Sequence, residues 1–187
     1  MINALSAALR GLAKVNAPIA RWGLSVSALF LAFMLVVALA QILSRVLFNH
    51  TLDWAEEAAR IALVWSALLA APIGYRAAGH VAITAFIEGL SMRTLCVTGV
   101  IVNALIAWIC AIFLLESFDF VARGSTIVST GLGIKMSFVY SIVPVALLAL
   151  LLVALEAILR LLHAIFADEP ELLLVGVVPV LQRDDEN

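Results

Sequence analysis

The chain has 187 residues, of which 65% are hydrophobic and only 13% are charged. A soluble domain is about half apolar and about a quarter charged, so this composition predicts an integral membrane protein. The formal net charge of −2 provides no broad basic surface for nucleic acid. No linker or internal repeat divides the sequence, which therefore predicts one compact bundle.

The first 21 residues are amphipathic. Leu5, Leu9 and Leu12 recur at helical spacing, with Arg10 and Lys14 between them. This pattern predicts that residues 1–21 form an N-terminal helix lying in the membrane interface. A cleaved signal peptide is the alternative, but the basic residues fall too late and the following apolar run is too long.

Four apolar stretches are long enough to cross a bilayer, which takes about 20 residues in a helix. Apolar residues occur all round each of them, as contact with lipid requires. We therefore expect an all-α integral membrane protein with four transmembrane helices in a domain of residues 22–163. The expected spans are residues 22–47, 54–75, 95–115 and 138–162, followed by a cytoplasmic tail of residues 164–187.

Basic residues predict the orientation of the bundle, because cytoplasmic segments carry an excess of lysine and arginine. If the N-terminus is cytoplasmic, that side holds seven basic residues and the other side holds four. Both termini are therefore expected in the cytoplasm. The seven are Arg10, Lys14, Arg21, Arg76, Arg93, Arg160 and Arg183, and the four are Arg45, Arg60, Arg123 and Lys135.

The turn between the first two spans is rich in charged residues. Asp53 is placed to cap the second helix, and Glu56 follows at capping-box spacing. Arg60 lies four residues after Glu56 and three after Glu57, so these side chains share one face. Because Arg60 should lie one to two turns inside the membrane surface, it is expected to be partly buried and to have a partner.

Two interpretations of this charged cluster remain. It could form an ion or proton site, or it could lock two helices together and bind a partner subunit. The second is favoured, because the acidic residues lie at a helix end rather than at the midplane, where transporter sites occur. Arg45, at the end of the first span, joins the same cluster.

Several residues inside the spans suit packing. Trp54 fits the aromatic belt at the surface. Trp65 and Trp108 lie deeper and face either lipid or another membrane protein. Asn103 is expected to form an interhelical hydrogen bond. Glu156 and Arg160 have the spacing of a local ion pair, Pro144 should bend the fourth helix, and Gly131 and Gly133 should form a turn before it.

The sequence predicts no enzyme and no cofactor. His50, His80 and His163 all fall near helix ends, whereas a haem-binding bundle needs paired histidines inside its spans. Cys96 and Cys110 have no metal-ligand spacing. No cluster of nucleophile, base and orienting group is evident either.

The sequence resembles a known family, the small membrane subunit (the Q or DctQ-like component) of tripartite ATP-independent periplasmic (TRAP) transporters. The similar segments are Arg45 and Phe48, the run from Leu52 to Arg60, and Trp65. Arg76 with the run from Gly79 to Ile83, and Ser129 to Ile134 with Tyr140 and Pro144, are also similar. The resemblance covers residues 25–160; Ala70-Ala71 and Val81 depart mildly from it.

The resemblance implies a non-catalytic scaffold in the bacterial inner membrane. A large membrane subunit would hold the substrate and sodium sites, and a periplasmic binding protein would deliver organic acids to it. A self-contained homo-oligomeric transporter or channel is the alternative, and it would need an acidic residue facing a central cavity. The candidates for structural or subunit-interface roles are Arg45, Asp53, Trp54, Glu56, Glu57, Arg60, Trp65, Arg76, His80, Asn103 and Trp108.

Overall fold

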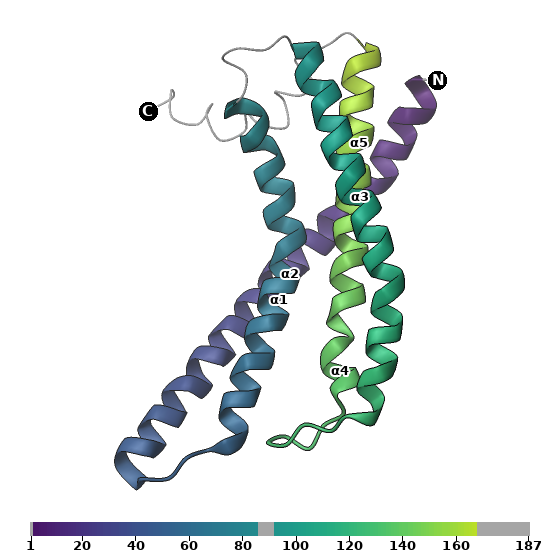
Figure 1. Cartoon of the computed structure of the whole chain (residues 1–187). Helices are drawn as coiled ribbons and strands as arrows, with labels where there is room; N and C mark the ends of the chain where they lie inside the picture. Colours follow the sequence, from purple (N-terminus) through teal and green to yellow (C-terminus); the bar gives the residue numbers. More distant parts are fainter. Residues whose placement is uncertain (1, 86–91, 168–187) are drawn as a thin grey trace, which may run out of the picture.

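The computed structural model describes residues 2–85 and 92–167, and these form a bundle of long helices (Figure 1). No β-strand occurs among them beyond one isolated bridge between Val128 and Lys135. The expected all-α membrane architecture is confirmed, because four helices are long and apolar enough to cross a bilayer. The elements are α1 (Ile2–Phe48), α2 (Asp53–Ala85), α3 (Met92–Arg123), the short 3-10 helix η1 (Gly124–Thr126), α4 (Met136–Tyr140) and α5 (Ile142–Ala167).

The helices form two antiparallel hairpins. α1 packs against α2, α3 packs against α5, and α5 also contacts α1 and α2. In Figure 1 α1 crosses α2 near the middle of the bundle and its N-terminal part passes α5, and the two hairpins lie apart toward the end that carries the α1–α2 turn. The described chain ends, Ile2 and Ala167, lie together at the opposite end, as four crossings of a membrane require. We call this opposite end the terminal side.

The apolar parts of the four spans are Trp22–Phe48, Asp53–Arg76, Val97–Thr126 and Met136–His163. The third extends beyond residue 115, where that span was expected to stop. Glu116 and Asp119 were expected in an outer segment, but they lie within the last turns of α3.

The N-terminal segment is not a separate helix. It is the start of α1, which continues through Pro18 into the first span. A proline inside a helix cannot donate to the carbonyl four residues earlier, here that of Lys14, yet the helix persists. Asn16, two residues before Pro18, is only 2% exposed, so this part of α1 is packed against its neighbours.

Small residues bring the helices of each hairpin together. An added Cβ on Gly23 of α1 would lie 3.3 Å from the Leu69 carbonyl oxygen of α2. One turn further along α1, the Ser27 hydroxyl donates to the Ser66 carbonyl at 2.7 Å. In the other hairpin, Gly99 of α3 faces Leu161 of α5, where an added Cβ would lie 3.0 Å from a methyl carbon. Close approach at glycine and serine is the usual way in which helices pack in lipid.

The fourth span is interrupted near its start. α4 ends at Tyr140 and α5 begins at Ile142, with a turn at Ser141. Pro144 explains the break, because its ring lacks an N–H for the Tyr140 carbonyl and excludes that carbonyl sterically. The sequence predicted a bend in one continuous helix, whereas the structure has two helices.

Candidate functional site

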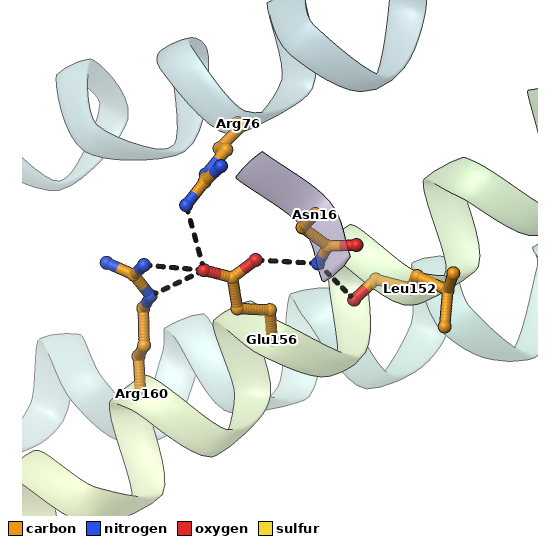
Figure 2. Close-up of polar contacts among 5 residues, drawn as sticks. All are labelled: Asn16, Arg76, Leu152, Glu156 and Arg160. Carbon is orange, nitrogen blue, oxygen red and sulfur yellow. Dashed lines mark hydrogen bonds and ion pairs between the residues drawn. The ribbon is translucent and has the colours of Figure 1, made fainter. Parts of the chain in front are cut away.

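A buried carboxylate lies where three helices meet (Figure 2). The Glu156 side chain of α5 is 3% exposed, and its Oε1 accepts hydrogen bonds from Arg76 of α2 at 3.0 Å and Arg160 of α5 at 2.5 Å. Its Oε2 accepts from the Asn16 amide of α1 at 2.6 Å. We call these four residues the Glu156 clamp. The pair of Glu156 with Arg160 was predicted, whereas Arg76 and Asn16 were not expected there.

Asn16 is oriented by two acceptors at once. Its Nδ2 donates to Glu156 and to the Leu152 carbonyl oxygen, the latter at 3.2 Å. The reverse orientation would place the amide oxygen against both acceptors, so the geometry selects this one. The Oδ1 atom is buried and has no hydrogen-bond partner among the described residues. Asn16 therefore holds α1 on α5 through its donor group alone.

A second polar contact joins the third helix to this level. The Tyr75 hydroxyl of α2 donates to Asn103 Oδ1 of α3 at 2.5 Å, and Asn103 Nδ2 donates to the Gly99 carbonyl. The expected interhelical hydrogen bond of Asn103 is thus confirmed. Tyr75 precedes Arg76 in α2. Polar contacts at one level therefore tie together the four long helices α1, α2, α3 and α5 on the terminal side.

Glu57 joins the two hairpins at the other end of the bundle. Its Oε2 accepts a hydrogen bond from the Gly131 backbone N–H at 2.8 Å. Gly131 belongs to the loop between η1 and α4, and an added Cβ there would lie 2.8 Å from that oxygen and 3.1 Å from the Asp53 carbonyl. Leu132 packs against the small cluster that contains Ala55 and Ala58. The loop is therefore docked on the first turns of α2.

The two glycines of this loop have different roles. Gly133 adopts a φ of 66° in the turn in which its N–H donates to the Ser129 carbonyl. Glycine adopts such a left-handed conformation without strain. Gly131 instead provides room for the contact with Glu57. The expected turn is confirmed, but the close approach of Gly131 to α2 gave no signal in the sequence.

Arg60 pairs with Glu56 at 2.7 Å, on one face of α2 as its spacing predicted. Both side chains are 70% exposed in the chain alone, whereas Arg60 was expected at a partly buried site. Asp53 is the first residue of α2 rather than its N-cap, and it accepts a long hydrogen bond from Thr51 at 3.5 Å. Arg45 lies exposed near the end of α1.

The three tryptophans among the candidate residues occupy different environments. Trp65 packs between Phe30 and Phe138, at ring-centroid distances of 5.3 and 5.6 Å, and its indole N–H donates to the Val139 carbonyl at 3.1 Å. The half-buried Trp65 therefore joins α1, α2 and α4. Trp54 and Trp108 are exposed. His80 lies on α2, but its side chain is outside the described part of the structure.

Comparison with known families decides what kind of protein this is. The family model for the DctQ component of tripartite ATP-independent periplasmic transporters matches residues 34–164, more than half of the chain. The chain belongs to this family. No curated protein and no solved structure matches it.

The matched region of this DctQ component includes the second half of the first span and all of the other three. It therefore contains Arg76, Glu156 and Arg160 of the Glu156 clamp, together with Glu57 and its loop partner Gly131. Asn16 lies before the matched region. The clamp thus combines three residues of the family region with one from the N-terminal part of α1.

Proposed function

We propose that this DctQ component is a non-catalytic scaffold of a sodium-driven secondary transporter that imports organic acids. It acts in the inner membrane of a bacterium. Its partners are a large membrane subunit, which binds the substrate and sodium, and a periplasmic protein that captures the substrate. The family supports a multi-pass membrane protein that serves a transporter.

The scaffold proposal is based on the surroundings of Glu156. A coupling site in a transporter needs a carboxylate that is open to an ion, and Glu156 is the most deeply buried carboxylate in the described spans. Two guanidinium groups and one amide occupy its oxygens. This arrangement suits a fixed structural link between helices, because an arriving cation would have to displace both arginines from Oε1 or Asn16 from Oε2.

Reconstitution tests the proposal. Purified chain in liposomes with an inward sodium gradient should take up no organic acid, with or without a periplasmic binding protein. Uptake should appear when the large membrane subunit from the same gene cluster is added. Sodium-dependent uptake by this chain alone, abolished by Glu156→Gln, would contradict the scaffold role and favour a self-contained transporter.

A further inference from the structure

The second span is the least apolar of the four, although little of it is buried within the chain. Its mean hydropathy is 1.4, compared with 2.6, 2.4 and 2.8 for the first, third and fourth spans. Of its 18 most apolar residues, 22% are buried within the chain, so most of this span is exposed. A helix that faces acyl chains is apolar all round, so part of the α2 surface needs a covering other than lipid.

From Glu56 to Arg76, the part of α2 whose side chains the structure describes, the exposed residues gather on one side. At about 100° per residue they fall within an arc of about 100°. This stripe starts with the ion pair of Glu56 and Arg60, continues through Leu63 and Val64, and ends in the small residues Ala67 and Gly74. An added Cβ on Gly74 would meet nothing within 4 Å. We call it the α2 stripe, and its members are Glu56, Arg60, Leu63, Val64, Ala67 and Gly74.

The charged end of the α2 stripe does not suit lipid. Arg60 lies seven residues into α2, about 10 Å along its axis from Asp53. Its guanidinium and the Glu56 carboxylate are both 70% exposed, and charged groups that face acyl chains are strongly disfavoured. The pair is neutral as a whole, so it fits a partner that offers hydrogen-bonding groups rather than a net charge.

The remaining length of the α2 stripe identifies the kind of partner. From Glu56 to Gly74 it extends about 27 Å along the helix, close to the thickness of the hydrocarbon core. Small residues such as Ala67 and Gly74 allow another helix to approach closely. The outward faces of α1 and α3 are different, because large side chains such as Leu35, Leu39, Leu105 and Trp108 cover them. Apart from the last turns of α3, where Glu116 and Asp119 are exposed, those faces suit lipid.

We propose that the α2 stripe binds a transmembrane helix of the large membrane subunit. The inference rests on the proposed function, which provides for such a subunit. A soluble binding protein does not fit, because the stripe continues through the depth of the membrane. In the assembly, polar groups of the partner helix contact Glu56 and Arg60. The backbone of the partner helix lies close to Ala67 and Gly74.

Co-purification of tagged chain with the large subunit from the same gene cluster tests this interface. Ala67→Trp places a large side chain in the α2 stripe and should lower the recovered large subunit at least tenfold. Ala104→Trp is the matched control, because Ala104 is an exposed alanine on the lipid-suited face of α3. It should leave recovery unchanged. Both variants should melt within about 2 °C of the wild-type chain when purified alone, as exposed substitutions do.

The outcomes separate the interface from the proposed function. If wild-type chain recovers the large subunit and Ala67→Trp recovers as much, the stripe faces lipid and the inference fails while the scaffold role survives. If wild-type chain recovers no large subunit, both fail. Ala67→Cys chains that cross-link to one another in the membrane would assign the stripe to a second copy, which also contradicts the inference.

Discussion

Replacing Glu156 with glutamine should destabilise the bundle, because it removes the charge on which the Glu156 clamp depends. The glutamine amide keeps one acceptor oxygen for the arginines, but its NH₂ group would face the Asn16 Nδ2, which now donates to Glu156 at 2.6 Å. Two donors would then meet in a buried site. Arg76 and Arg160 would also be left without a counter-charge.

The size of the expected loss of stability follows from the burial of Glu156. Removing one partner of a buried ion pair costs about 3–5 kcal/mol. The lower end applies here, because the Arg76 and Arg160 side chains are 28% and 37% exposed and retain some solvation. A loss of about 3 kcal/mol lowers the melting temperature of a chain of this size by about 6–12 °C.

Thermal unfolding of the purified chain in detergent, followed by tryptophan fluorescence, measures this effect. Glu116→Gln is the control, because it makes the same chemical change at an exposed position of α3. It should shift the melting temperature by less than about 2 °C. If Glu156→Gln melts within 2 °C of Glu116→Gln, roughly the limit for an exposed position, the reasoning from burial and pairing is refuted.

Two further predictions concern the loop that precedes α4 and the orientation of the bundle. Gly131→Val should detach the loop, because its Cβ would lie 2.8 Å from the Glu57 carboxylate oxygen, and trypsin should cut after Lys135 several-fold faster than in Thr130→Val. Equal cleavage rates in the two variants would show that Gly131 is not needed for docking. Reporter fusions should place residue 187 in the cytoplasm and the loop near Gly124 outside. An externally folding reporter that is active at residue 187 would reverse the orientation.

Local spacing predicted the parts of the structure that depend on one helix. Apolar length located the four spans, and four-residue separation predicted the pairs of Glu56 with Arg60 and Glu156 with Arg160. The long-range contacts could not be predicted in this way. Arg76 and Glu156 are 80 residues apart in the chain, and Asn16 and Glu156 are 140 apart. Only the packing of α5 against both α1 and α2 brings these residues together.

One signal for Asn16 was present in the sequence. It continues the helical spacing of Leu5, Leu9 and Leu12, so it lies on the face expected to be apolar. A polar residue on that face indicates a buried hydrogen bond rather than an interfacial helix. Pro18, two residues later, does not end the helix, because α1 continues through it. Trp65 was ambiguous for another reason: depth alone does not distinguish a lipid-facing ring from one packed between Phe30 and Phe138.

The separation of Arg76 from Glu156 has a consequence for biogenesis. Ribosomes add about 5–20 residues per second, so Glu156 is synthesised roughly 4–16 s after Arg76. During this interval the first hairpin is already long enough to insert, while the guanidinium that will face Glu156 has no carboxylate to neutralise it. The nascent chain therefore passes through a stage in which the first hairpin is incompletely neutralised. A chain truncated before α5 would remain at that stage and become a substrate for membrane quality control.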